Sequence, residues 1–150
     1  MTKRASVAVP LKFFGQARTT VRAQLAAAAE ESAGARATLS EFLRIHLEFL
    51  GANPEIAALL YDDAAAPAGE RALCEHRRLM LFLISKFERI VVDGKKAKRI
   101  RGDVDPAMAA VHYLGVVQMA WMFWTISGRR GDLIDAGIQF FEQFWAGIGT

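Results

Sequence analysis

Three histidines are the residues of this sequence best suited to bind a metal. His46, His76 and His112 would supply three of the four ligands of a tetrahedral zinc site if they met in space. They fall on three different predicted helices, and no two of them are four residues apart, the spacing that brings two side chains to one helical face. We therefore expect histidines of the core or of its rim, and no metal site.

The sequence also offers few residues for catalysis. Cys74 is the one cysteine, and it precedes His76 by two residues, so that the two side chains point away from each other on a helix. Asp62 and Asp63 are adjacent, and their diverging carboxylates do not suit a general acid and base pair. We expect a protein that is not an enzyme and that uses no cofactor.

The composition fits one domain that stays in the cytoplasm. A chain of 150 residues is long enough to bury one core without cross-links. A single cysteine excludes an intramolecular disulfide, as is usual in a reducing compartment. The start, "MTKRASVAVPLKFF", lacks the apolar core and cleavage site of a secretory signal. A net charge of +3 favours no particular class of partner.

The spacing of apolar residues predicts an all-α fold. They recur every three or four positions, and the alternation typical of half-buried strands is absent, so we expect a bundle of about six helices. The first helix is expected at residues 11–31. Thr38 and Glu41 have the spacing of a capping box and predict the start of the second helix. "DDAAAPAGE" is expected to be a loop, and Gly94 is expected to end the long helix that follows it.

Three further helix starts are predicted by a polar cap. Asn53 precedes Pro54, which suits the first position of a short helix that ends at about Tyr61. Asp105 precedes Pro106 in the same way, and Asp132 is expected to cap the last helix.

The run "KKAKRIRGD" is the one dense basic segment, and it lies between two predicted helices. It suits either a phosphate-binding patch or a solvated loop whose cations lie near a helix C-terminus. Because no aromatic residues are interleaved to stack on bases, we favour the solvated loop.

The stretch "PAMAAVHYLGVVQMAWMFWTISG", residues 106–128, has no Asp, Glu, Lys or Arg. As a helix it would be roughly 33 Å long, enough to span a membrane, and it is apolar on both faces. A helix of this kind is a membrane span, the centre of a large core, or a helix between its own core and a partner.

The last predicted helix favours a partner over a membrane. It has an apolar arc wider than one contact in a small bundle needs, and a lone membrane span would leave that arc unexplained. We therefore expect a homodimer in which the last two helices of each copy form a four-helix bundle. The expected dimer residues are Met108, Val111, Gly115, Met119, Met122, Ile134, Ile138, Phe141 and Trp145.

The order of these elements resembles a known family. "FLRIHLEFLGANPEIAALLYDD" looks like the helix, "NPE" turn and short helix in the ligand-binding domain of TetR-family transcriptional regulators. "KAKRIRGDVDPAMAAVHYLGVV" resembles that family's basic turn, cap and first dimerisation helix, and "WTISG" precedes the second. The resemblance covers roughly residues 36–148.

The resemblance implies a C-terminal domain that pairs through its last two helices and holds a small apolar effector between the earlier ones. Such regulators read DNA through an N-terminal helix-turn-helix of roughly fifty residues. Only 35 residues precede the matching region, so we expect residues 1–35 to be a leader and helix without a complete DNA-binding head, and 36–150 to bind effector and dimerise. DNA is then a partner only through a helix-turn-helix missing from this sequence.

Bulky side chains from three stripes are expected to form the effector site, because apolar pockets use aromatic and Met side chains with a few polar groups. His46, Tyr113 and Gln118 are the expected orienting polar groups. The predicted ligand-binding residues are His46, Phe49, Met80, Phe87, Tyr113, Val117, Trp121 and Trp124. The alternative function, a membrane-associated or partner-binding helical protein without a DNA role, depends on the same charge-free stretch.

Overall fold

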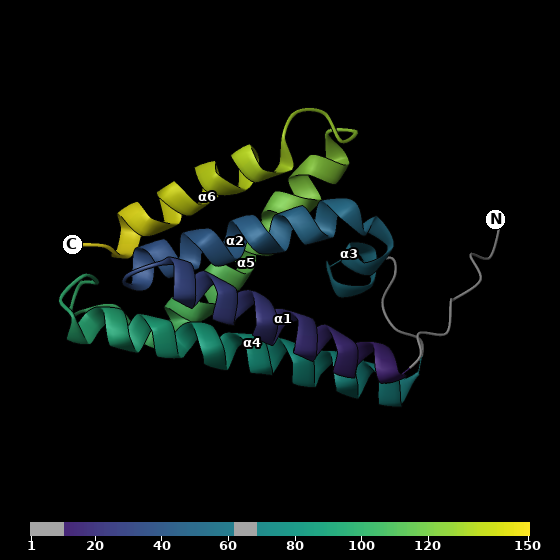
Figure 1. The fold of residues 1–150 in the computed structure, drawn as a ribbon, viewed down its shortest axis with the longest axis horizontal. Coiled ribbons are helices and arrows are strands. Elements are labelled where there is room, and N and C mark those ends of the chain that lie inside the picture. Colours follow the sequence, from purple (N-terminus) through teal and green to yellow (C-terminus); the bar gives the residue numbers. More distant parts are fainter. Residues whose placement is uncertain (1–10, 62–68) are drawn as a thin grey trace.

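A computed structural model describes residues 11–61 and 69–150 of the chain. This part is helical, with no strand among its residues; an isolated β-bridge joins Ile100 to Gly149. The all-α prediction is therefore confirmed, while most of the loop predicted at "DDAAAPAGE" lies outside the described residues. The helices, shown in Figure 1, are α1 (Leu11–Glu31), α2 (Ala35–Ala52), α3 (Pro54–Tyr61), α4 (Glu70–Lys96), α5 (Pro106–Ile126) and α6 (Leu133–Ile148).

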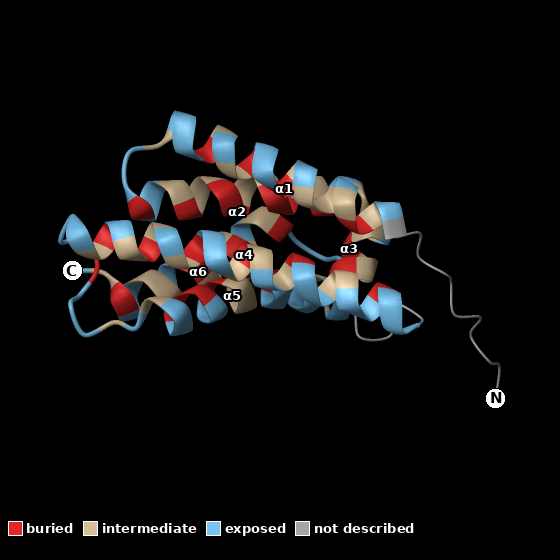
Figure 2. Ribbon diagram, turned by 90° about the horizontal axis from the view of Figure 1, so that it is seen from below, coloured by how far each residue is buried: buried red, intermediate tan, exposed pale blue. Residues whose placement is uncertain are grey.

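The second helix, α2, is the centre of the bundle. It packs against α1, α3, α4, α5 and α6. Around it, α1 packs against α4, α4 against α5, and α5 against α6. Figure 2 shows buried residues on the inward sides of the helices and exposed residues on the outward sides. The predicted division at residue 35 stays a prediction, but α1 shares the core of the other helices through Phe14, Val21 and Ala28.

The core is rich in aromatic residues. The ring of Tyr113 from α5 lies 4.6 Å from Phe87 of α4 and 6.2 Å from Phe141 of α6, measured between centroids. Its hydroxyl donates a hydrogen bond of 2.6 Å to the Leu39 carbonyl of α2. One side chain therefore joins four helices, and it fixes which side of α5 faces inward.

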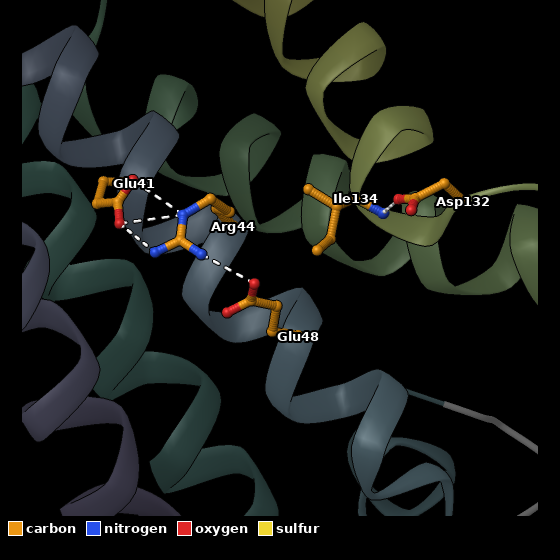
Figure 3. Close-up of polar contacts among 5 residues, drawn as sticks. All are labelled: Glu41, Arg44, Glu48, Asp132 and Ile134. Atoms are coloured by element: carbon orange, nitrogen blue, oxygen red, sulfur yellow. Dashed lines mark hydrogen bonds and ion pairs between the residues drawn. The ribbon is translucent and has the colours of Figure 1, made fainter.

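The two aspartate caps are confirmed. The Asp105 carboxylate accepts a hydrogen bond of 2.9 Å from the Met108 N–H at the start of α5. At the start of α6, Asp132 accepts a bond of 2.8 Å from the Ile134 N–H (Figure 3). It also accepts a bond of 3.0 Å from the Asp135 N–H. Both satisfy N–H groups that the first helical turn leaves without a partner.

The predicted capping box at Thr38 and Glu41 is wrong. The second helix starts three residues earlier, at Ala35, after Gly34 with φ of +90°. The Thr38 N–H donates to the Gly34 carbonyl, as inside a helix. Glu41 instead pairs with Arg44, which also reaches Glu48 at 2.9 Å (Figure 3). Glu41 therefore takes part in an ion pair on the surface of α2 and does not cap the helix.

One predicted cap, at Asn53, and one predicted helix end, at Gly94, also need correction. Asn53 does precede the first residue of α3, but its side-chain amide donates to the Phe49 carbonyl of the preceding helix at 2.8 Å. Gly94 does not end α4, which continues to Lys96. A Cβ at Gly94 would lie 2.7 Å from Ile100 Cδ1 and 2.8 Å from Ala35 Cβ, so the glycine serves close packing.

The basic run is only partly a loop. Lys95 and Lys96 belong to the last turn of α4, where cations suit the negative end of the helix dipole. Lys98 and Arg99 are exposed, whereas Ile100 is buried. This agrees with a solvated segment that is held to the bundle by one apolar residue.

Helix α5 is the one helix in the described part of the chain that is long and apolar enough to cross a membrane. The core helix of a soluble protein passes the same test. Here α5 packs against both α4 and α6, and Ala110, Tyr113 and Val117 are buried within the bundle. These contacts agree with a helix that has its own core on one side.

The close approach of α6 to α2 gives a stability prediction. A Cβ at Gly137 would overlap with Leu47 Cδ1 and lie 3.6 Å from Ala120 Cβ. Gly137→Ala is therefore expected to lower the free energy of unfolding by about 1 to 3 kcal/mol, measured by urea denaturation. Gly15→Ala is the matched control, because a Cβ there meets no atom within 4 Å. It should leave stability unchanged or raise it by up to about 1 kcal/mol. Equal effects of the two substitutions would contradict the packing argument.

Candidate functional site

Three buried polar side chains from three helices form a hydrogen-bonded chain inside the apolar core. His46 of α2 lies 2.8 Å from Gln24 Oε1 of α1 through Nδ1, and 2.9 Å from the Tyr61 hydroxyl of α3 through Nε2. All three residues are buried, and His46 is only 1% exposed. We name Gln24, His46 and Tyr61 the polar triad.

The bonds of the polar triad are satisfied by a neutral imidazole. The Gln24 carbonyl accepts from Nδ1–H, and Nε2 accepts from the Tyr61 hydroxyl, an assignment that follows from the network. Burial lowers the pKa of His46 from 6.5 to about 4, because the charged ring would lose its hydration. Burial also raises the pKa of Tyr61. The polar triad is therefore uncharged at neutral pH.

Aromatic rings surround the polar triad. The His46 ring stacks on Phe42 at 5.3 Å and lies 6.5 Å from Phe49, between centroids. Phe42 in turn contacts Phe87 at 5.3 Å, and Phe87 contacts Tyr113. The structure thus brings four predicted ligand-binding residues together: His46, Phe49, Phe87 and Tyr113.

The other predicted ligand-binding residues are more scattered. Val117 and Trp121 are buried on the inward side of α5, and Met80 is half-buried against the core. Trp124 lies near the C-terminal end of α5, where its Nε1–H donates to the Gly131 carbonyl at 3.2 Å. Gln118 is exposed on the outer side of α5, so its prediction as an orienting group for the interior is wrong.

Sequence reasoning missed two members of the polar triad. Gln24 is three residues after Val21 and four before Ala28, so it shares the buried face of α1. Its position among apolar residues at helical spacing could have predicted a buried polar side chain. Tyr61, the last residue of α3, follows Ala57 by four residues, and both are buried. Its partner on another helix could not be seen in the sequence.

Three surface pockets formed by described residues lie away from the polar triad. One of about 590 Å³ is lined by Arg36, Ser40, Arg99 and Trp145 among others. A second, of about 400 Å³, separates the start of α5 from the end of α6, and a third, of about 280 Å³, lies beside Cys74. None of the eight predicted ligand-binding residues lines these three pockets.

The outer side of α5 is an exposed apolar face without charge. Gly115 lies within it and has no atom within 4 Å of its Cβ position. His112, Gln118 and Thr125 are its polar members. We name this surface the α5 face; its large apolar residues are Met108, Val111, Met119, Met122, Phe123 and Ile126.

The predicted dimer residues of α6 do not lie on the side of α6 that adjoins the α5 face. Phe141 is fully buried in the chain's own core, so its prediction as a dimer residue is wrong. Ile134, Ile138 and Trp145 are half-buried. They share the side of α6 where Glu142 pairs with Arg36 of α2 at 2.7 Å. That side faces α2.

The α5 face continues onto another part of α6. Phe140 contacts Phe123 at 5.9 Å between ring centroids. Gln143 and Gly147 line a pocket together with Met108. Phe140, Gln143 and Gly147 share one side of α6 at intervals of three and four residues. These three residues, which sequence reasoning missed, adjoin the α5 face.

The three histidines have different surroundings. His46 belongs to the polar triad, His76 Nε2 bonds with the Leu60 carbonyl at 3.0 Å, and His112 is exposed. Among residues 11–61 and 69–150, no group of three or more His, Cys, Asp or Glu side chains is arranged to hold a metal ion.

Burial of His46 gives a pH prediction. Its pKa is about 4 in the folded chain and near 6.5 when unfolded, so acid favours the unfolded state. The contribution of neutral His46 is complete above pH 6.5 and is lost as the pH falls toward 4. The difference in unfolding free energy between wild type and His46→Gln should fall by about 3 kcal/mol from pH 7 to pH 4. Denaturant titrations at several pH values measure it. A difference that does not change with pH would mean that His46 is hydrated.

Comparisons with known proteins identify the fold. No protein-family model and no curated protein matches the sequence. Solved structures do match. FadR from Bacillus subtilis, in complex with stearoyl-CoA, is 15% identical with a TM-score of 0.74, over 92% of this chain and 72% of that one.

Two further regulators give the same result. MbdR from Azoarcus sp. CIB is 13% identical with a TM-score of 0.74, over 93% of this chain and 75% of that one. A TetR transcriptional regulator from Chloroflexus aurantiacus is 16% identical with a TM-score of 0.64, over 89% of this chain and 67% of that one. The chain therefore has the fold of TetR-like transcriptional regulators, as its sequence predicted.

Proposed function

We propose that this chain is the effector-binding and dimerisation domain of a TetR-like transcriptional regulator. The observation that carries the proposal is the uncharged α5 face, which adjoins α6 in a fold shared with FadR and MbdR. The proposal assigns no DNA-reading helix to the described residues, and DNA contact is left to a helix-turn-helix outside them. A regulator of this kind acts in the cytoplasm.

The α5 face is suited to a second copy of the chain. Met108 and Ile126, near its two ends, are 57% and 76% exposed. Removing apolar surface from water is favourable, so a second copy that covers this face would be stabilised there. Large exposed apolar patches mark interaction sites. A twofold axis would pair α5 and α6 with their copies, which closes a four-helix bundle. Phe140, Gln143 and Gly147 would then join the interface in place of Phe141.

A charge on the α5 face should separate the dimer. Met119→Glu places a carboxylate at the centre of this face, and burying that carboxylate without a cation is costly. The dissociation constant of the dimer should therefore rise at least about 100-fold. Leu81→Glu is the matched control, because Leu81 is 55% exposed and belongs to α4, which is not one of the two helices of the proposed interface. Sedimentation equilibrium measures both variants.

A wild-type protein that stays monomeric at micromolar concentration would contradict the dimer. The alternative, a membrane-associated or partner-binding protein, is motivated by the same face. It would be favoured if the monomeric wild type bound to lipid vesicles and Met119→Glu did not.

The interior is proposed to bind an apolar effector. FadR from Bacillus subtilis was solved with stearoyl-CoA, a molecule with a long apolar chain. In this chain, Phe49 and Met80 are half-buried at the edge of the aromatic core, and an unbranched Met side chain adapts readily to a new neighbour. We propose that such side chains shift to admit the effector beside the polar triad.

Stearoyl-CoA is the first probe for this site. If it binds, the unfolding free energy should rise, by about 2.7 kcal/mol at a ligand concentration of 100 times the Kd. Thermal denaturation measures the change. Coenzyme A without an acyl chain is the control and should have little effect. Equal stabilisation by both compounds would place binding at the charged surface and contradict an apolar interior site.

A further inference from the structure

We infer that the interior site selects effectors whose polar head is uncharged, and that the polar triad is the group that recognises this head. The inference rests on the proposed effector-binding function and names the chemical class of the effector. Alcohols, ketones, esters and thioesters belong to that class. Carboxylates, phosphates and ammonium groups do not, and any such group on an effector would have to stay in water.

The first argument is the absence of buried charge. Among the described residues, Gln24 and His46 are the buried polar side chains apart from the two tyrosines, and no Asp, Glu, Lys or Arg is buried. On the same helix, Arg44 pairs with Glu41 and Glu48 at the helix surface. A carboxylate that entered the core would lose its hydration without gaining a cation, which is strongly unfavourable.

The second argument is that His46 does not supply the missing cation. Both ring nitrogens already bond with Gln24 and Tyr61. The rings around the imidazole are those of Phe42, Tyr61 and Phe49, and none of them carries a charge. Protonation is opposed by burial, which holds the pKa of His46 near 4. At neutral pH the imidazole therefore meets a ligand as a hydrogen-bonding group without charge.

The third argument is that the polar triad can offer either a donor or an acceptor. With Nδ1 protonated, Nε2 is an acceptor; if the Gln24 amide turns round and donates to Nδ1, Nε2 carries the proton and becomes a donor. A hydroxyl or a carbonyl oxygen can therefore replace the Tyr61 hydroxyl at Nε2. Tyr61 is the member best placed to move, because it is the last residue of α3.

Probes with the same chain and different heads test the inference. Decan-1-ol, undecan-2-one and decanoate are titrated at pH 7.5, with tryptophan fluorescence and calorimetry as readouts. We expect decanoate to bind at least about 100-fold more weakly than the two uncharged probes. Decanoate binding as tight as decan-1-ol would overturn this inference and leave the proposed apolar effector in place. If no probe binds, both the inference and the effector half of the proposed function fail.

Variants of the polar triad identify the recognising group. Tyr61→Phe and His46→Gln should each change the ratio of the decan-1-ol and decanoate affinities by about 10-fold or more. A ratio is informative because general loss of stability weakens both probes alike. Thr19→Val is the control, since it removes an exposed hydroxyl that bonds to the Gly15 carbonyl of α1, and it should leave the ratio unchanged. If neither triad variant changed the ratio of the two affinities, a group outside the polar triad would recognise the polar head of the probe.

Discussion

The packing of every other helix against α2 is the constraint on which this structure depends. Seven residues of α2 are buried, from Ala35 to Leu50, and they meet five different helices. The backbone of α6 comes so close to α2 that a Cβ at Gly137 would require the Leu47 side chain to shift. A central helix of this kind fixes the positions of its neighbours, so the faces that they turn outward are also fixed.

The rotation of α5 follows from this constraint. Tyr113 is held by its hydrogen bond to the Leu39 carbonyl of α2 and by the rings of Phe87 and Phe141. Once Tyr113 points inward, residues half a turn away must point outward. Met119 and Met122 therefore reach the surface although nothing in their chemistry favours water. The apolar surface that we assign to a second copy is therefore a consequence of the contacts that hold Tyr113 in the core.

Local chemistry was predictable from the sequence, and contacts between distant residues were not. The limits of α1 and α3 and the caps at Asp105 and Asp132 depend on neighbours in the sequence, and these predictions are confirmed. The role of Gly94 depends on its close packing against Ala35 of α2, which is distant in the sequence. For the site, His46 and its aromatic neighbours follow from helical stripes. Their partners in the polar triad do not, because Gln24 and Tyr61 are brought to His46 by packing.

In the proposed function, the polar triad would let a small ligand affect a large part of the domain. Its three members belong to α1, α2 and α3, and His76 of α4 holds the carbonyl of Leu60, next to Tyr61. A ligand that takes the place of the Tyr61 hydroxyl removes one bond from the end of α3, and that end is tied to α4. Because buried polar groups must find new partners when they lose old ones, the change cannot stay at one side chain. Coupling between helices is therefore a property of the same network that keeps the interior uncharged.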